Sequence, residues 1–232
     1  MRNRLSATLG LAGLALVLAG CVSLKRTDEA RFFVLQSLVE PQPAAQDPVA
    51  LVGVETARLP GHLERPQLVT WVAPGELKID EFLRWAEPLE DGVTRTLAEN
   101  LAALLPDHQV VRRPWAGDVE MRCRVRVALR EFGLQRDGTV LLTGQFRLLP
   151  GRGDLALVMR PVRLEHGVSA GAPADAPPDP GVDAMNELLE QLSRQVADAI
   201  RALPPEKDAA DAENDVADLE EETVESEKIE DR

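Results

Sequence analysis

The sequence predicts a single α/β domain, a mixed β-sheet with flanking amphipathic helices. Two segments, residues 88–105 and 182–203, repeat apolar side chains at the spacing of one helix face. Short β-branched or alternating segments, bounded by turns that contain Pro or Gly, have the pattern of strands. Because these strands surround one long helix and end at another, they favour a mixed sheet with helices packed on it.

The first twenty residues have the pattern of a signal peptide. Arg2 and Arg4 supply positive charge, residues 9–18 form an uncharged apolar run, and small residues lead to Gly20. The apolar run is about half the ~20 residues that a transmembrane helix needs. We therefore expect residues 1–20 to be removed from the mature protein.

The sequence Leu18-Ala19-Gly20-Cys21 is typical of a bacterial lipoprotein signal. Its small residues fit the processing enzyme, and the thiol of Cys21 accepts diacylglycerol. Each buried CH₂ group adds ~0.8 kcal/mol, so several acyl chains hold a protein permanently on a membrane. We predict a lipid anchor at Cys21, followed by a polar tether at residues 21–30. The alternative is an ordinary secreted protein whose cleavage site happens to precede a cysteine.

The rest of the chain divides into a domain and an acidic tail. Residues 31–205 are long enough for one hydrophobic core. Cys123 is the only other cysteine, so with Cys21 lipidated no intramolecular disulfide forms. Residues 206–232 hold 13 acidic and 3 basic residues, or −10 of the net charge of −13. This segment has too few apolar residues to offset the entropy of ordering, and we predict that it is disordered.

Deleting residues 206–232 is expected to leave the melting temperature of the protein almost unchanged. A tail that buries no apolar surface does not stabilise the native state. Thermal unfolding of the full and truncated proteins, followed by circular dichroism, checks this. A drop of many degrees would show that the tail packs on the domain.

The first half of the domain predicts three strands and a helix. The strands are expected at residues 31–36, 49–57 and 67–72. A connector at residues 58–66 contains two prolines and a glycine, which exclude a regular ladder. Pro88 suits the first turn of the helix, which ends before Pro106. Its apolar face consists of Leu89, Val93, Leu97, Leu101, Leu104 and Leu105.

The second half predicts further strands and a final helix. The strands are expected at residues 109–113, 119–130, 139–149 and 155–164. Arg136-Asp137-Gly138 is a hairpin-turn signal. Residues 166–181 are rich in Gly, Ala and Pro and predict a loop. The helix face at residues 182–203 consists of Met185, Leu188, Leu189, Leu192, Val196, Ile200 and Leu203.

Five motifs occur in order after Cys21. They are Arg31-Phe32-Phe33-Val34-Leu35, Leu59-Pro60-Gly61-His62-Leu63-Glu64-Arg65-Pro66-Gln67-Leu68-Val69, Arg84-Trp85-Ala86-Glu87-Pro88-Leu89, Leu97-Ala98-Glu99-Asn100-Leu101 and Pro114-Trp115. Together they resemble the ABC-type transport auxiliary lipoprotein family, over about residues 31–200. The acidic tail and the loop at 166–181 depart from the family pattern without touching these motifs.

The resemblance implies an α/β fold with a mixed sheet and a role in lipid transport. Members of the family are lipoprotein partners of MCE-domain transport systems, which move lipids between the two membranes of Gram-negative bacteria. In common sorting an Asp directly after the lipidated cysteine retains a lipoprotein in the inner membrane. Here that residue is Val22, so we expect the outer membrane, on its periplasmic face.

An acyl hydrolase is the enzymatic alternative. Residues 167–171 match the G-x-S-x-G pattern, with Ser169 as nucleophile. That pattern needs a helix directly after the serine, whereas residues 172–180 contain four prolines. All three histidines precede Ser169, although the usual order of this triad places the histidine after the serine. We therefore predict a loop here and no catalytic residue.

Motifs for metals and nucleotides are absent from the sequence. His62, His108 and His166 are far apart and fit no zinc spacing. The acidic run at residues 220–222 lacks the spacing of a calcium loop. No glycine-rich phosphate loop occurs, so an ATPase would be a separate subunit. We expect no metal, no cofactor and no nucleic-acid partner.

Charged and aromatic residues suggest contact surfaces. Four arginines alternate with apolar residues, and we interpret them as a solvated sheet face, or alternatively as a contact for anionic headgroups or an acidic partner. They are Arg122, Arg124, Arg126 and Arg130, between Cys123, Val125, Val127 and Leu129. Trp71, Trp85 and Trp115 favour core packing over an interface role.

The connector at residues 59–66 and the segment at 84–89 form the candidate interface. Loops on a rigid scaffold commonly carry binding residues. We predict that His62, Arg65, Arg84 and Trp85 contact an MCE-domain partner or, in a homo-oligomer, a second copy. The predicted function is that of a non-enzymatic accessory lipoprotein. A structural envelope lipoprotein without a transport partner is the third possibility.

Overall fold

Strand β6 (Cys123–Gln135) is the centre of the sheet. The structure is a computed structural model that describes residues 29–43, 45–115, 119–168 and 179–204. β6 pairs antiparallel with β7 (Thr139–Pro150), and β7 pairs antiparallel with β8 (Val158–Gly167). A turn joins β6 to β7, with Gly138 at φ 82° and its N–H bonded to Gln135 O at 3.1 Å. The predicted hairpin is therefore confirmed.

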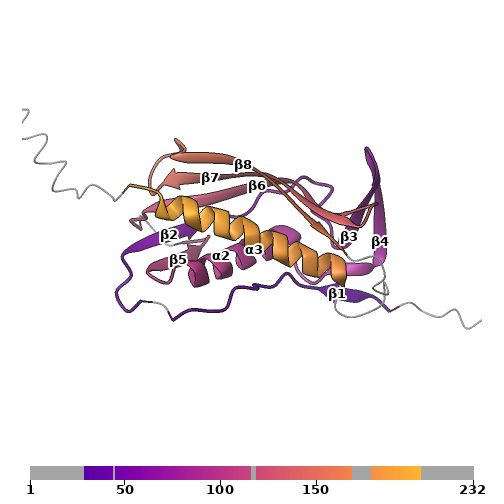
Figure 1. Ribbon diagram of the computed structural model, residues 1–232, viewed down its shortest axis with the longest axis horizontal. Helices are drawn as coiled ribbons and strands as arrows, with labels where there is room; N and C mark the ends of the chain where they lie inside the picture. Colours follow the sequence, from indigo (N-terminus) through magenta and orange to yellow (C-terminus); the bar gives the residue numbers. More distant parts are fainter. Residues whose placement is uncertain (1–28, 44, 116–118, 169–178, 205–232) are drawn as a thin grey trace, which may run out of the picture.

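The other side of β6 meets two separate groups of strands. Its first residues pair in parallel with β2 (Ala50–Val54), which also pairs in parallel with β5 (His108–Arg112). Its last residues pair in parallel with β3 (Gln67–Ala73). β3 then pairs antiparallel with β4 (Glu76–Trp85), and β4 in parallel with β1 (Arg31–Phe33). The result is the mixed sheet that the sequence predicts, forked on one side of β6 (Figure 1).

The segment from Glu55 to the start of the connector lies in this fork and bonds to the middle of β6. Glu55 N donates to Val125 O, and Arg58 N donates to Val127 O, each at 2.9 Å. Arg58 O accepts from Leu129 N, also at 2.9 Å. The connector is irregular, as its prolines predict, but these bonds fix it to the sheet.

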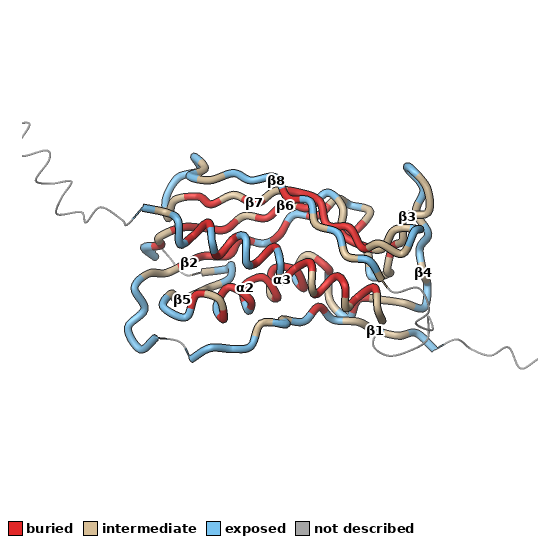
Figure 2. The backbone as a smooth tube through the Cα atoms, in the orientation of Figure 1, coloured by how far each residue is buried: buried red, intermediate tan, exposed pale blue. Residues whose placement is uncertain are grey.

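Two helices, α2 (Leu89–Leu104) and α3 (Pro180–Arg201), pack against each other and against the sheet. Their predicted apolar faces are buried apart from Leu104 and Leu203, which are partly buried. A buried hydrogen bond of 3.0 Å from Asn100 Nδ2 to Ser193 Oγ joins the helices. Buried residues concentrate where the helices meet the central strands (Figure 2). Each fully buried Leu contributes about 1.5–3 kcal/mol, so this layer supplies much of the stability.

The helices begin at slightly different residues from those predicted. Pro88 is the N-cap residue of α2 rather than part of its first turn. α3 starts at Pro180, inside the predicted loop. Asp179 caps it, because its carboxylate accepts from Gly181 N at 2.9 Å and Val182 N at 3.4 Å. The carboxylate of an N-cap Asp accepts hydrogen bonds from the free backbone N–H groups of the first helical turn, and proline has no N–H that would need a partner. An Asp followed by Pro is therefore a strong signal for the start of a helix.

Several strand predictions are wrong in extent. No element was predicted where β4 lies, because its exposed residues do not alternate cleanly and its pairing with β3 shifts register. β6 continues five residues beyond Arg130, past an irregularity between Leu129 and Glu131. β1 ends at Phe33, and β8 starts at Val158. Pro161 is tolerated in β8 because that strand is an edge whose paired neighbour is β7.

The two ends of the long axis of the molecule are formed by different elements. β1, which follows the predicted tether, lies at one end of the long axis, and the turn between β7 and β8 lies at the other with the end of α3 (Figure 1). Arg122 Nη2 donates to Leu203 O at 3.0 Å and so ties the residues just after α3 to the start of β6. None of the helices in the described ranges is long and apolar enough to cross a membrane.

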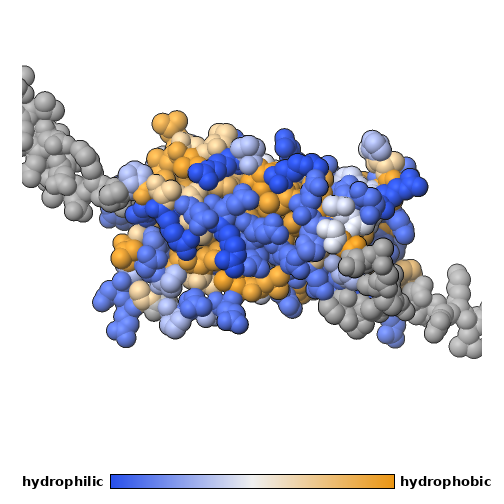
Figure 3. Space-filling model, viewed as in Figure 1, coloured by the Kyte–Doolittle hydropathy of each residue, from blue (hydrophilic) through white to orange (hydrophobic). Residues whose placement is uncertain are grey.

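The exposed surface has both hydrophilic and apolar regions. The outer side of α3 is largely hydrophilic, while apolar side chains gather over the turn between β7 and β8 (Figure 3). That group consists of Leu155, Leu157 and Met159, with Leu155 87% exposed.

Candidate partner-binding groove

The connector and the start of α2 border an open groove of about 420 Å³. Glu64, Arg65 and Pro66 line one side, and residues 85–90 line the other. We call this hollow the connector groove. It brings together two segments that the sequence predicts as interface, although they are separated by β3 and β4 along the chain.

Backbone hydrogen bonds hold the two sides of the connector groove at a defined separation. Trp85 N donates to Pro66 O at 2.6 Å, and Ala86 N donates to Phe33 O at 2.9 Å. The connector itself turns at Pro60, whose carbonyl accepts from Leu63 N at 2.8 Å. Trp85 is only 7% exposed and belongs to the core, and it also lines the groove.

Arg65 is the cation of the connector groove. It is half-buried and makes no ion pair within the described part of the chain. Its Nε atom is buried and lacks a hydrogen-bond partner there. A buried donor without an acceptor carries a desolvation cost of about 1–3 kcal/mol. Arg65 is therefore suited to an acceptor supplied from outside the described residues.

The acidic residues of the groove are not equivalent. Glu87 accepts from Arg95 Nη2 at 2.6 Å and from Arg95 Nε at 3.2 Å. Hydrogen bonding to Glu87 raises the pKa of the Arg95 guanidinium above its ordinary value. Arg95 Nη2 also donates to Leu35 O at 2.7 Å, which ties this pair to the segment after β1. The charge of Glu87 is thus compensated within the domain, and Glu64 and Glu90 remain as the anionic rim.

Two other predicted site residues lie elsewhere. Arg84 neighbours Trp85 in β4, but alternation along the strand places it on the opposite side, beside Phe32. It forms an exposed ion pair with Glu81 at 3.7 Å. His62 packs edge-on against Trp71, with ring centroids 5.7 Å apart. The structure brings Arg65 and Trp85 together and separates them from Arg84 and His62.

The connector groove continues along the molecule as two shallower hollows of about 430 Å³ each. The first shares Glu64 and Glu90 with the groove and reaches Arg113, and the second extends to Trp115. The Arg113 guanidinium stacks over the Trp115 ring at 4.9 Å. Sequence reasoning missed Arg113, although it directly precedes the Pro114-Trp115 motif.

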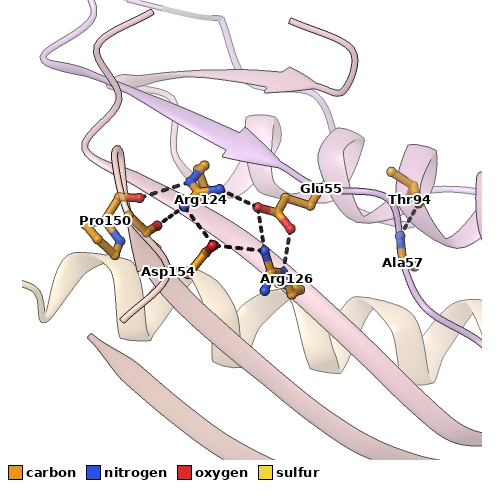
Figure 4. Close-up of polar contacts among 8 residues, drawn as sticks. Glu55, Ala57, Thr94, Arg124, Arg126, Pro150 and Asp154 are labelled. Carbon is orange, nitrogen blue, oxygen red and sulfur yellow. Dashed lines mark hydrogen bonds and ion pairs between the residues drawn. The ribbon is translucent and has the colours of Figure 1, made fainter. Parts of the chain in front are cut away.

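A buried charge cluster fixes the start of the connector (Figure 4). Glu55 accepts from Arg124 Nη1 at 2.8 Å and from Arg126 Nε at 2.5 Å. The side chains of Glu55 and Arg124 are only 10% and 11% exposed. Hydrogen bonding to Glu55 raises the pKa of Arg126, so its positive charge is maintained.

The same arginines hold the turn between β7 and β8. Arg124 Nε donates to Pro150 O at 3.0 Å, and its Nη2 donates to Gly153 O. Both arginines also approach Asp154, at 3.4 and 3.5 Å (Figure 4). The interpretation of this row as a solvated face is wrong for Arg124 and Arg126. The alternation itself is confirmed, because Cys123, Val125, Val127 and Leu129 are buried.

The described residues offer no metal cluster, since no three of their His, Cys, Asp and Glu side chains come together. Ser169 lies outside the described residues. His166 Nδ1 lies 2.9 Å from Glu187 Oε2 on α3. The connector groove presents an arginine, a largely buried tryptophan and an acidic rim, which are features of a binding surface.

Comparison with known proteins gives a family and relatives. Residues 33–197 match the family described as ABC-type transport auxiliary lipoprotein component. The chain is 30% identical to the intermembrane transport lipoprotein PqiC of Escherichia coli K12 over 195 residues, which cover 82% of this chain and 95% of that protein. PqiC of Shigella flexneri gives the same values.

Solved structures show the same fold. The crystal structure of an uncharacterized protein has a TM-score of 0.56 at 26% identity, over 69% of this chain and 99% of that one. A protein from Xanthomonas campestris has a TM-score of 0.55 at 15% identity, over 72% of this chain and 92% of that one.

Proposed function

This chain belongs to the ABC-type transport auxiliary lipoprotein family, and from that premise we propose that it is an outer-membrane-anchored accessory lipoprotein of an MCE-type lipid-transport system. The observation that carries the proposal is the match to PqiC, an intermembrane transport lipoprotein, over 95% of that protein. A transport-auxiliary role follows from this membership. The identity of the membrane, the identity of the partner and the location of the binding surface are our proposals.

The anchor is supported by the sequence before the domain. Cys21 follows the small residues of a lipoprotein signal, and Val22 takes the place of the Asp that retains lipoproteins in the inner membrane. We therefore assign the domain to the periplasmic face of the outer membrane. Residues 206–232 are proposed to be a disordered acidic tail.

The proposed activity is binding rather than catalysis. The relatives are named as transport lipoproteins, which favours this assignment. Affinity purification of the lipidated protein from detergent-solubilised envelopes is expected to recover an MCE-domain protein. Recovery of envelope proteins without any MCE-domain or transporter subunit would instead favour a structural lipoprotein. Labelling of the purified protein by a fluorophosphonate probe would favour an esterase that uses Ser169.

We propose the connector groove as the surface for the MCE-domain partner. Arg and Trp are over-represented among residues that dominate binding energy at interfaces. Arg65 and Trp85 supply both in the lining of a site fixed by backbone hydrogen bonds. A fixed site loses little conformational freedom on binding, which favours affinity.

Replacing Arg65 with glutamate is expected to weaken association with the partner at least about tenfold, or about 1.4 kcal/mol. The change adds a third acid beside Glu64 and Glu90, where the wild-type protein has a cation. Charge reversal at a complementary surface slows encounter and adds repulsion. Pull-down at matched expression measures the change, and circular dichroism checks that the domain remains folded.

The matched control for this experiment is Arg136→Glu. Arg136 is exposed in the turn between β6 and β7 and does not line the connector groove. The Arg136→Glu substitution changes the net charge by the same amount as Arg65→Glu. Comparison of the two variants therefore separates the loss of a local contact from a general effect of charge. If folded Arg65→Glu protein recovers as much partner as the control does, the groove is scaffold and the partner binds elsewhere.

A further inference from the structure

We infer that the side of β1 and β4 that faces away from the core rests on the phospholipid surface to which Cys21 is attached. This inference depends on the proposed lipidation of Cys21. The contact surface consists of Phe32, Val34 and Phe82, which we call the anchor-side patch. It orients the domain on the membrane, while the acyl chains provide the attachment.

The anchor-side patch is apolar and exposed. Phe32 is 63%, Phe82 46% and Val34 41% exposed. Phe32 pairs with Arg84 across β1 and β4, so alternation places Phe82, two residues before Arg84, on the same side as Phe32. Phe33 and Trp85, the next pair, face the other side and pack with the core.

The chain leads directly from the anchor to this patch. β1 is the first strand of the structure and begins ten residues after Cys21. Ten residues reach at most about 35 Å even when fully extended. A short tether keeps its attachment point near the membrane at a high effective concentration. The end of the domain with β1 is therefore the end that the anchor keeps near the bilayer, and the turn between β7 and β8 lies at the opposite end (Figure 1).

The charges beside the patch are compatible with a headgroup layer. Arg84 lies next to Phe32 on the same side, and its exposed ion pair with Glu81 at 3.7 Å is loose enough for a lipid phosphate to replace Glu81. Asp80 keeps its negative charge, but its carboxylate is turned toward its own strand, where it accepts from Phe82 N at 2.9 Å and Leu83 N at 3.2 Å. Apolar rings with an adjacent arginine are typical of surfaces that enter the boundary between headgroups and acyl chains.

The size of the patch favours lipid over a second copy of the chain. A stable protein–protein interface buries about 800 Å² on each partner and needs complementary shape. Three side chains around a three-residue edge strand fall well short of that area. A fluid lipid surface has no shape to match, so isolated aromatic residues can bury themselves there.

Labelling of an introduced cysteine tests this contact, because neither native cysteine is expected to react with the label. Cys21 is consumed by lipidation, and Cys123 is buried with 0% exposure. The Val34→Cys variant keeps both phenylalanines and accepts an environment-sensitive fluorophore such as NBD. Leu155→Cys is the matched control, since Leu155 is apolar, 87% exposed and part of the turn between β7 and β8, which lies at the opposite end from β1 (Figure 1). Both lipidated, full-length variants are reconstituted into phosphatidylethanolamine–phosphatidylglycerol vesicles.

The label at position 34 is expected to shift to the blue and to be quenched by doxyl-labelled phospholipid, while the label at 155 does neither. Adding Phe32→Ser and Phe82→Ser to the Val34→Cys variant should abolish the quenching, while the protein still floats with vesicles through its lipid. A blue shift at 34 that doxyl lipid does not quench would mean that protein covers the patch, and would overturn the inference.

Flotation distinguishes this inference from the proposed anchor. Wild-type protein that does not float with vesicles would overturn the anchor and the membrane contact together. Protein that floats but gives the same unquenched emission at 34 and 155 would overturn the membrane contact alone. The lipid anchor would then stand, with the domain held off the membrane.

Discussion

A Cys21→Ser variant is expected to lose membrane association almost completely while its domain stays folded. The anchor-side patch exposes three large apolar side chains, which are too few for stable attachment without acyl chains. To prevent an unprocessed signal from acting as an anchor, residues 1–20 of the variant are replaced by an ordinary cleavable secretory signal. Fractionation of periplasm and membranes measures the effect, and circular dichroism of the released protein reports folding.

Cys123→Ser is the matched control for this variant. Cys123 is buried in β6, so its loss affects the core but not the attachment. The control is expected to remain in the membrane fraction. Full membrane retention of Cys21→Ser would show that the protein is held by something other than a lipid on Cys21.

A Glu55→Ala variant is expected to lose about 3 kcal/mol or more of unfolding free energy. Glu55 forms ion pairs with both Arg124 and Arg126, and Arg124 is nearly as buried as Glu55. Removing one partner of a buried ion pair leaves an uncompensated charge in a poorly solvated place, which costs about 3–5 kcal/mol. Asp154 also pairs with both arginines, at 3.4 and 3.5 Å, but its side chain is 77% exposed, so solvent screens these pairs and they replace little of the lost interaction. Urea unfolding followed by circular dichroism measures the loss.

Glu165→Ala provides the comparison for a surface pair. Glu165 also pairs with an arginine, Arg163, but both side chains are largely exposed. Exposed pairs contribute about 0–1 kcal/mol because water and salt screen them. A Glu55→Ala variant that is no less stable than Glu165→Ala would show that Arg124 and Arg126 find other partners or water.

The Glu55 cluster also has a consequence for the connector groove. Glu55 is the residue after β2, where the connector leaves the sheet, and it ties that point to β6 and to the turn at 150–154 (Figure 4). We therefore expect Glu55→Ala to loosen the connector before the whole domain unfolds. Hydrogen exchange at Ala57, whose N–H is bonded to Thr94 Oγ1 at 2.9 Å, would report that loosening.

Local patterns in the sequence determined much of this protein. The lipoprotein signal, the turn at Gly138 and the two helices are encoded by residues next to one another or one helical turn apart. Such patterns need no knowledge of distant contacts, because a turn or a helix face repeats the same local geometry wherever it occurs. The family motifs are likewise contiguous, and their order predicted both the family and the mixed sheet.

Only the tertiary structure decided how distant segments combine. Glu55 and Arg124 are 69 positions apart, so the sequence gives no local sign that they pair, and the arginine row alone suggested a solvated face. Arg84 and Trp85 are adjacent in sequence yet face opposite sides of the sheet, because both belong to β4. The sequence does not predict this strand, because its register with β3 is irregular. Strand pairing and buried charge pairing depend on which residues meet across the fold. That choice is made by burying the core as a whole, and no short stretch of sequence contains it.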